Sequence, residues 1–392
     1  MLTFFKSLRH RRGSGTTCNM TDHRLTRIAQ SLPDTVPFVA PERLEELRGA
    51  PFDARLGANE LAYGPSPAAI AAMHDAVGDI WKYGVPETPA LKRVLAEHLG
   101  IPEAALTIGE GIDGLLGTLV RLFVEPGDTV VTSAGSYPTF NYHVAGVGGA
   151  LHTVPYAENH EDPQALIGKA REVRAKLVYL SNPNNPMGSV HDAATVQAMI
   201  EAVPDGCLLV LDEAYCEFAP EATRPPINID DRRVIRFRTF SKAYGMAGAR
   251  IGYGIAHPDI ARAFDKLRNH FGVNRVALAG AVAALADQEY LEDVVGRISR
   301  GREKLAQIAR AEGLVPLPSA TNFVTMDTGR DGAFARALLR ALEARGVFVR
   351  MPGIAPLDRC IRVSVGTDGE LEIFARHLPL ARADVLKGSP EA

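Results

Sequence analysis

The chain has 392 residues, 46% apolar and 23% charged, and 43 Lys and Arg against 46 Asp and Glu leave a net charge of −3. This composition excludes a mainly disordered chain, and at ~150 residues per domain the length predicts about two domains. The near-neutral balance provides no field that would hold nucleic acid or an anionic membrane surface, so we expect small-molecule partners.

Residues 1–20 are basic, and charges interrupt their apolar stretch before the ~7-residue core of a secretory signal can form. We interpret them as a flexible arm, with Met20 as an alternative start of the chain. The segment that follows is rich in proline, including Pro33, Pro37 and Pro41. Because proline interrupts helices, this segment is predicted to wrap over the molecule rather than form a long helix.

The four cysteines, Cys18, Cys207, Cys216 and Cys360, are scattered along the chain. No pair has the C-x-x-C spacing of a zinc site or a redox pair, so we expect no metal site and a reducing, cytoplasmic location. The longest run of small apolar residues, Ala277–Ala286, is shorter than the ~20 residues of a membrane-spanning helix. We therefore expect no membrane span.

From about Leu91 onward, short apolar runs alternate with amphipathic stretches. This pattern is typical of βα units that cover a mostly parallel sheet, and it predicts an α/β fold. The predicted strands are Asp128–Ser133, Lys176–Leu180, Cys207–Leu211 and Val234–Arg238. Ligands of open α/β sheets bind beyond the carboxyl ends of the strands, so the residues that follow these runs are the candidate functional residues.

The second half of the chain changes character and predicts a smaller α+β domain. The expected helices are Leu291–Gly313 and Ala333–Arg345, and the expected strands are Asn322–Met326, Val347–Arg350 and Cys360–Val365.

A glycine motif precedes an amphipathic stretch in the first half. Gly109, Gly111 and Gly114 spell G-x-G-x-x-G, and backbone N–H groups at the start of the following helix can hold a phosphate. A dinucleotide site also needs an acidic residue at the end of the next strand, about 20 residues further on. That strand ends in Thr132 and Ser133, which disfavours a nicotinamide cofactor.

Lys242 follows a predicted strand and is flanked by small residues. Desolvation there would favour the neutral amine that forms an imine, whereas the competing interpretation is a surface lysine. Asp212 follows the apolar run CLLVL, where a carboxylate is costly unless it meets a cation such as a pyridinium nitrogen; the alternative is a helix N-cap. Asn185 lies in a segment dense in turn residues and alone indicates only a loop.

The order of these residues favours one shared site over independent accidents. The glycine loop is followed by an aromatic cluster and then by polar residues at strand ends: Tyr137, Phe140, Tyr142, Asn185, Asp212, Tyr215, Lys242 and Arg250.

These motifs resemble those of the fold-type I pyridoxal phosphate (PLP) aminotransferases of class I and II, most closely the histidinol-phosphate aminotransferase branch. The resemblance implies a large PLP-binding domain over residues 61–285 with a mostly parallel central sheet, and a small α+β domain over 286–392. Residues 21–60 would pack on the small domain and on a dimer partner. The matching segments include RLGANELAYGPSP, WKYGVPETPALKRVLAEHLGI, IGEGID, PTFNYH, SNPNNPMG, LDEAY, TFSKAYGMAGARIGYG, ATNFV and CIRVSVG.

The resemblance also implies roles for individual residues. Lys242 would form the internal aldimine and shuttle the substrate's α-proton. Asp212 would pair with the pyridine nitrogen, keeping it protonated so that the cofactor can take up an electron pair. Tyr215 and Asn185 would bind the ring hydroxyl, and Phe140 would lie on the ring face.

The remaining implied contacts concern the phosphate, the dimer and the substrate. Tyr83 would reach the phosphate from the neighbouring subunit, which implies a homodimer with shared sites. Arg362 would grip the substrate's anionic group, with Arg350 and Asn322 nearby. The phosphate-binding residues of the same subunit would be the backbone of Gly111, Ile112 and Asp113 together with Thr239, Ser241 and Arg250.

The chain departs from the family pattern at several positions. Leu61 and Ala62 replace an Asn-Pro pair, and Met187 replaces a threonine, a change we expect to be tolerated. Phe38 stands where the branch often has a tyrosine that contacts the substrate phosphate; the lost hydrogen bond to a charged group is worth about 1.5–3 kcal/mol. This departure puts histidinol phosphate in doubt as the donor.

The leading hypothesis is therefore an aminotransferase that exchanges an amino group between an amino acid or histidinol phosphate and a 2-oxo acid such as 2-oxoglutarate, by a ping-pong cycle. An aromatic amino acid such as phenylalanine is the alternative donor. A PLP-dependent decarboxylase resembling threonine-phosphate decarboxylases is a second hypothesis, and a nicotinamide oxidoreductase is a third. A PLP-binding regulatory module is disfavoured because the short basic arm contains no DNA-binding extension.

Overall fold

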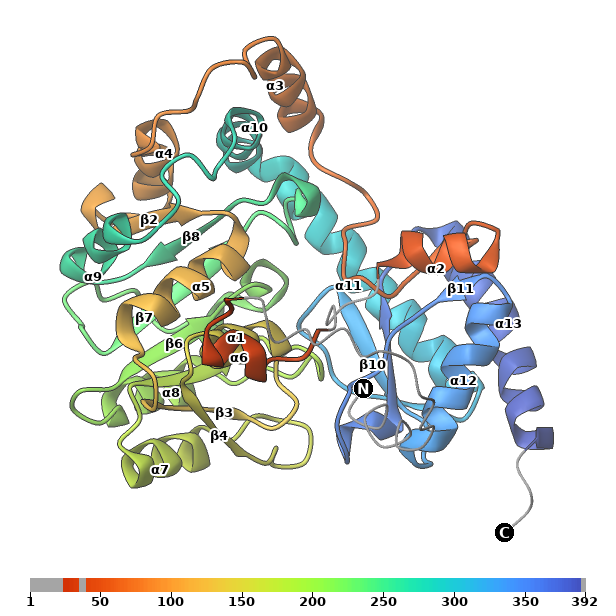
Figure 1. Cartoon of the computed structure of the whole chain (residues 1–392). Coiled ribbons are helices and arrows are strands. Elements are labelled where there is room, and N and C mark those ends of the chain that lie inside the picture. Colours follow the sequence, from red (N-terminus) through yellow and green to blue (C-terminus); the bar gives the residue numbers. More distant parts are fainter. Residues whose placement is uncertain (1–23, 35–39, 389–392) are drawn as a thin grey trace.

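The structure, a computed structural model, describes residues 24–34 and 40–388. The expected basic arm and Phe38 lie outside these residues. Figure 1 shows two lobes, a larger one built on a seven-stranded sheet and a smaller one built around a three-stranded sheet. The long helix α11 (Gln288–Ala311) runs from the larger lobe into the smaller one.

The central sheet is mostly parallel, as predicted. Only β8 runs antiparallel to its neighbours β2 and β7, and the other pairs are parallel. The strands, in their order across the sheet, are β2 (Leu106–Gly109), β8 (Gly252–Ile255), β7 (Val234–Thr239), β6 (Leu208–Asp212), β5 (Leu177–Ser181), β3 (Thr129–Ser133) and β4 (Ala150–Val154). The four predicted strands are confirmed as β3, β5, β6 and β7, each to within one residue at either end.

The middle of the sheet is covered on both faces, which explains the continuous apolar runs of its strands. Leu177 and Tyr179 of β5 point into a core cluster that contains residues of α5, whereas Val178 and Leu180 point into a cluster built with α7 and α8. This alternation is the two-residue period of a strand. The covering helices are α5 (Gly111–Phe123), α6 (Pro138–Gly146), α7 (Pro163–Val173) and α8 (Ala193–Ala202).

The β2–β8 edge of the sheet packs against a separate group of helices. Their core cluster joins residues of β2 and β8 to residues of α3, α4 and α10. The helices of this region are α3 (Pro67–Val77), α4 (Pro89–Leu99), α9 (Pro258–Ala263) and α10 (Arg275–Ala286).

The smaller lobe is an α+β unit. Its antiparallel sheet has the order β12 (Cys360–Ser364), β10 (Phe323–Asp327), β9 (Val315–Pro316), and it packs with α11, α12 (Gly332–Ala344) and α13 (Asp368–Gly388) around one core. The predicted helices and strands of this half are present. The strand expected over Val347–Arg350 ends at Phe348 as β11 (Val347–Phe348), and Arg350 continues as an isolated bridge to Arg362.

The N-terminal segment joins the smaller lobe. Strand β1 (Ala54–Arg55) pairs in parallel with β11, and Leu56 and Leu61 are buried in the core of that lobe. Leu61, one of the departures from the family pattern, therefore fills this core. Helices α1 (Arg27–Ser31) and α2 (Pro41–Arg48) precede β1. Among the described residues, no helix combines the length and hydropathy of a membrane span.

Candidate active site

The candidate residues gather at the carboxyl ends of β5, β6 and β7. Asp212 is the last residue of β6, Thr239 the last of β7, and Ser181 the last of β5. Arg362, on β12 of the smaller lobe, donates to Asn185 Oδ1 at 2.5 Å. The site is therefore built where the two lobes touch.

Lys242 presents its amine inside this site. Its Nζ donates to the carbonyl oxygen of Asn59 at 3.0 Å and lies 5.6 Å from the centre of the Tyr215 ring. Burial, reinforced by the positive charges of Arg362 and Arg250, lowers the pKa of Lys242 to about 8. A larger neutral fraction favours imine formation, so the structure disfavours the alternative of an ordinary surface lysine.

Asp212 is a buried carboxylate, 5% exposed. Its Oδ2 accepts from the Tyr179 hydroxyl at 2.6 Å and its Oδ1 from the backbone N–H of Ala214 at 2.9 Å. Burial raises the pKa of Asp212 against the effect of these hydrogen bonds. The N-cap alternative fails, because the next helical turn, Cys216–Phe218, begins only after Tyr215.

Tyr215 and its neighbour Asn59 connect the two lobes. Asn59 Nδ2 donates to the Tyr215 hydroxyl at 3.0 Å, and Ser364 Oγ donates to Asn59 Oδ1 at 3.0 Å. Burial raises the pKa of the Tyr215 phenol. Asn59 was not predicted as a site residue, although it bonds to three of them, Tyr215, Lys242 and Asn322. Its φ of 55° is a conformation that asparagine tolerates better than most residues.

Asn322 was predicted to contact the substrate, but its position in the structure differs from that prediction. It is fully buried, and its Nδ2 donates to the carbonyl oxygens of Asn59 at 3.1 Å and Glu60 at 3.2 Å. A side chain with no exposed surface cannot touch a substrate. Asn322 instead holds the 59–60 turn in place, and through it the carbonyl that receives the Lys242 amine.

The residues predicted to bind the phosphate form a cradle at the start of α5. Gly111 has a φ of +73°, and a Cβ at this position would come within 2.5 Å of Arg250 Nη2. Arg250 Nη1 donates to Ser241 Oγ at 3.4 Å, and Thr239 Oγ1 donates to the same hydroxyl at 2.9 Å. The N–H groups of the first turn of α5, including that of Ile112, have no partner within the helix.

Two residues near the cradle differ from the simplest expectation. Gly109 ends strand β2 and so does not belong to the loop, which makes the loop shorter than the motif suggests. Asp113 Oδ1 lies 2.9 Å from His143 Nε2. Its carboxylate is therefore engaged with His143, which leaves its backbone as the group available to a phosphate.

Phe140 was predicted to lie on the face of the cofactor ring, and the structure places it elsewhere. Its ring is fully buried and stacks on the Tyr179 ring with centroids 4.7 Å apart, so no face is free for a cofactor. Tyr137, at the N-cap of α6, is only partly buried, and the charges of Asp113, Asp212 and Arg250 act on its phenol. Of the two aromatic residues Tyr137 and Phe140, Tyr137 is the one that lies near the charged residues of the site.

Arg362 is held in a fixed orientation. Besides Asn185, it donates through Nη2 to the carbonyl of Gly57 at 3.3 Å, and its guanidinium lies 5.2 Å from the centre of the Phe323 ring. Burial lowers its pKa to about 10. Arg350 exchanges two backbone hydrogen bonds with Arg362, and its own guanidinium lies over the Phe348 ring.

Tyr83 lies apart from the other residues. It is 80% exposed, and its ring packs on Phe271 with centroids 4.8 Å apart. Among the described residues, no hydrogen bond or ring contact joins it to another candidate residue of the same subunit; its carbonyl accepts from Arg275 at 2.8 Å. Phe271 is exposed as well, and so are several apolar side chains of the segment that leads to Tyr83 and follows it: Ile70, Val77, Ile80, Trp81 and Val85.

The arrangement fits PLP. Because Gly111 has no side chain, the cradle leaves a space beside the Arg250 guanidinium, and a Cβ at position 111 would fill that space. The amine of Lys242 matches an aldehyde, and the buried carboxylate of Asp212, bonded only to neutral donors, matches a cationic ring nitrogen.

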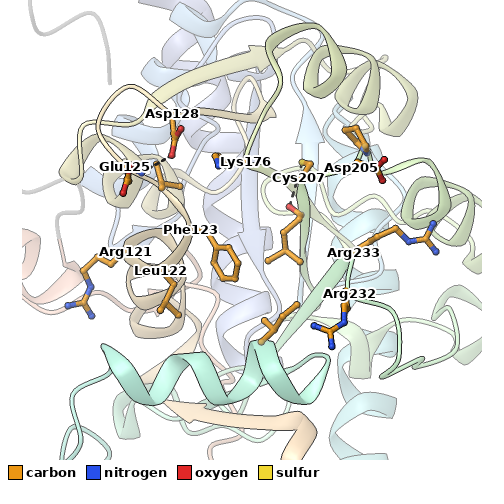
Figure 2. A pocket seen from close by; sticks show the side chains of 15 residues that line it. Arg121, Leu122, Phe123, Glu125, Asp128, Lys176, Asp205, Cys207, Arg232 and Arg233 are labelled. Carbon is orange, nitrogen blue, oxygen red and sulfur yellow. Dashed lines mark hydrogen bonds between the residues drawn. The ribbon is translucent and has the colours of Figure 1, made fainter.

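A hollow of about 700 Å³ lies at the opposite edge of the sheet, where the strands begin (Figure 2). Its lining includes Lys176, Asp205 and Arg233, and none of the predicted site residues. Lys176 and Asp205 are exposed, and the charge of Arg233 is paired with Asp231 at 2.8 Å, so no charge among these three is both buried and unpaired.

Comparisons with known proteins agree with this geometry. A family model described as aminotransferase class I and II matches residues 54–378. A histidinol-phosphate aminotransferase of Nitrosococcus oceani is 36% identical over 352 residues, covering 89% of this chain and 94% of that protein. One of Moorella thermoacetica is 34% identical over 349 residues, covering 87% and 89%. The crystal structure of histidinol-phosphate aminotransferase from Sinorhizobium meliloti in complex with pyridoxal-5'-phosphate is 54% identical, with a TM-score of 0.90, and the match covers 93% of this chain and 98% of that one.

Proposed function

This chain belongs to the class I and II aminotransferases, and from that premise we propose that it moves an amino group between histidinol phosphate, or a closely related amino donor, and a 2-oxo acid such as 2-oxoglutarate. It is a PLP-dependent enzyme. The observation that carries the proposal is geometric: the buried amine of Lys242, bonded to the Asn59 carbonyl at 3.0 Å and 5.6 Å from the Tyr215 ring, shares the site with the buried Asp212 carboxylate, which bonds only to neutral donors.

Each residue of the site has a distinct task. When bound, PLP supplies a ring that takes up the electron pair released at the substrate's Cα. Lys242 would hold the cofactor through its amine and would serve as the group that takes the proton from the substrate's Cα and returns it. Asp212, oriented by Tyr179, partners the ring nitrogen. Tyr215 and Asn185 bind the ring hydroxyl.

The phosphate and the substrate are held by separate cationic groups. Arg250, Ser241 and Thr239 receive the cofactor phosphate together with the backbone at the start of α5, where the helix dipole favours an anion. Arg362 is oriented toward the substrate's anionic group by Asn185. Because a guanidinium fork binds carboxylate and phosphate alike, this residue suits both an amino acid and a phosphorylated donor.

The names of the relatives support histidinol phosphate as the donor, whereas Phe38, which lacks the tyrosine hydroxyl of that branch, counts against it and leaves an aromatic amino acid as the alternative donor. A donor panel separates them. The PLP-loaded enzyme is mixed with one amine at a time, and the absorbance of the bound cofactor is followed; 2-oxoglutarate is then added to restore the starting spectrum. We expect histidinol phosphate to react with the highest kcat/KM. Carbon dioxide release without 2-oxo acid turnover would instead indicate a decarboxylase.

We also propose a homodimer with shared sites, supported by the exposed Tyr83 and by the exposed apolar side chains of the same segment. Tyr83 would contact the phosphate bound by the other subunit. Homodimers of the Lys242→Ala variant should be inactive, and homodimers of the Tyr83→Ala variant should have little or no activity. Mixed dimers of the two should regain one intact site, and no regain of activity on mixing would contradict shared sites.

A cytoplasmic location completes the proposal. The free thiols of Cys207, Cys216 and Cys360 are buried and support a reducing compartment. Cell fractionation with an antibody to the native chain tests it.

A further inference from the structure

A buried carboxylate lies beneath the turn that carries Asn185. Glu161 lies between β4 and α7, is 1% exposed, and belongs to none of the groups assigned above. Its Oε2 accepts from Ser181 twice, from the backbone N–H at 2.9 Å and from Oγ at 3.1 Å. The Ser181 hydroxyl in turn accepts from Asn184 Nδ2 at 3.0 Å. One carboxylate oxygen thus anchors the first part of the turn.

The second part of the turn is anchored to the same residue. His191 Nε2 lies 2.9 Å from the carbonyl oxygen of Glu161. The backbone of His191 bonds to the side chain of Asn182 in both directions, at 2.8 and 3.2 Å. Both ends of the segment from Ser181 to His191 are therefore tied to Glu161.

This segment is coupled to the reaction site on two sides. Ser181 pairs with Asp212 across the sheet, and the N–H of Asn182 donates to the carbonyl of Asp212 at 2.9 Å. Further along, Asn185 is partly exposed while its neighbours are buried, and its Oδ1 receives the guanidinium of Arg362. A shift of the turn would move Asn185 and Arg362 together.

We propose that Glu161 is a positioning residue of the aminotransferase site, which sets the placement of Asn185 and, through it, the orientation of Arg362. The inference rests on the proposed function. A carboxylate suits this task because one oxygen accepts two donors of the same residue. Removing it would leave the Ser181 N–H buried without an acceptor, a costly state that the turn can relieve only by moving.

Two substitutions and one control test the proposal. Glu161→Ala removes the acceptor, and Glu161→Gln keeps one acceptor oxygen and the volume. Leu166→Ala opens a cavity in a fully buried position of the adjacent helix α7 and removes no hydrogen bond to the turn. The measurements are kcat and KM for the amino donor, the pH titration of the visible absorbance of the bound cofactor, and amide hydrogen exchange at Ser181 in cofactor-free protein.

For Glu161→Ala we expect kcat/KM for the amino donor to fall roughly 10–100-fold, the range that a small misplacement of reacting groups produces. The absorbance titration should shift because Asn185 is proposed to bind the ring hydroxyl, and exchange at Ser181 should accelerate. Glu161→Gln should restore all three to within about twofold of the wild type, since the acceptor remains. Leu166→Ala should lower the melting temperature and leave kcat/KM and the titration unchanged.

The proposal is overturned if Glu161→Ala leaves kcat/KM and the absorbance titration unchanged, or if Leu166→Ala reproduces both changes. Should Glu161→Ala fail to fold, Ser181→Ala removes one of the two donors to Glu161 and is expected to shift the absorbance titration. An unshifted titration in Ser181→Ala also overturns the proposal. If the wild type itself turns over no donor, the proposed function fails, while exchange and the titration still decide the role of Glu161.

Discussion

The carboxyl ends and the amino ends of the strands form two opposite sides of the central sheet, which we call the carboxyl edge and the amino edge. Charged side chains are buried at the first and exposed to water at the second. At the carboxyl edge, Asp212 is buried and bonds only to neutral donors, and Lys242 has its amine desolvated. At the amino edge, around the hollow of Figure 2, Arg232 is exposed and pairs with Asp259 at 2.7 Å. Exposed pairs of this kind contribute little. A buried charged group that has no bonded partner of opposite charge is a better indicator of a functional site than an exposed ion pair.

Replacing the lysine at each edge is the strongest way to break this comparison. Lys242→Ala should lose transamination by several orders of magnitude, because no other amine can hold the cofactor and move the proton. Lys176→Ala, at the hollow, should retain it. The measurement is single-turnover reaction with the amino donor, with borohydride reduction and peptide mass analysis to locate the bound cofactor. Wild-type turnover by Lys242→Ala would refute the assignment of the site.

The aspartates provide the next contrast. Asp212→Ala should reduce kcat by several orders of magnitude, since the cofactor ring would no longer be kept protonated. Asp212→Asn, which preserves the shape and the acceptor for Tyr179, should lose nearly as much. Asp205→Ala at the amino edge should leave kcat unchanged. A small loss in Asp212→Asn would mean that shape rather than charge matters at this position.

Two glycines with nearly the same backbone sharpen the comparison further. Gly111 and Gly206 have φ values of +73° and +76°, so alanine costs each about 1–2 kcal/mol of backbone strain. Only at Gly111 would the new Cβ meet the Arg250 guanidinium; nothing lies within 4 Å at Gly206. Both variants should therefore melt lower by a similar amount. Gly111→Ala alone should weaken PLP binding, by roughly 10–100-fold if one charge-assisted contact to the phosphate is lost.

Equal PLP affinities in Gly111→Ala and Gly206→Ala would show that the cradle does not hold the phosphate. Equilibrium titration of cofactor-free protein, followed by the quenching of its fluorescence, measures the two dissociation constants directly.

The predicted strands and the missed ones differ in a physical way. Strands β5 and β6 are buried on both faces, so their sequences are continuous apolar runs that stand out. Strand β4 lies at the sheet edge and is only partly buried, and β8 contains two glycines, so neither has a strand-like composition. Packing against the neighbouring strand, rather than intrinsic preference, decides these segments.

The site residues follow the same division. Lys242 and Asp212 could be predicted because they lie at the carboxyl ends of buried strands, Asp212 as the last residue of β6 and Lys242 three residues after β7. Phe140 and Tyr137 could not be told apart from sequence, since the start of α6 between them turns one ring into the core and the other toward the site. Asn59 was missed because its contacts with Tyr215 and Lys242 span more than 150 residues of sequence.

The smallest expected effect is a shift in one titration. Burial and the charge of Arg362 lower the pKa of Lys242 from 10.5 to about 8. The amine is protonated below that value, so its reaction with a neutral acylating reagent should rise with pH and level off above about 8. The folded state also binds fewer protons than the unfolded state between pH 8 and 10.5, so the free-energy cost of burying this amine falls, and the stability rises, as pH increases through that window.

Competitive labelling of cofactor-free protein, with a small free amine as internal standard and peptide mass analysis for the site, measures the midpoint at Lys242. Arg362→Gln should move that midpoint upward, because one repelling positive charge is removed while the burial of the amine stays. Arg232→Gln, at the other edge of the sheet, should leave it where it is. A labelling midpoint near pH 10.5 for Lys242 in the wild type would mean that its amine is solvated. Asp212 would then be the one residue of this pair that supports a difference in burial of charge between the two edges of the sheet.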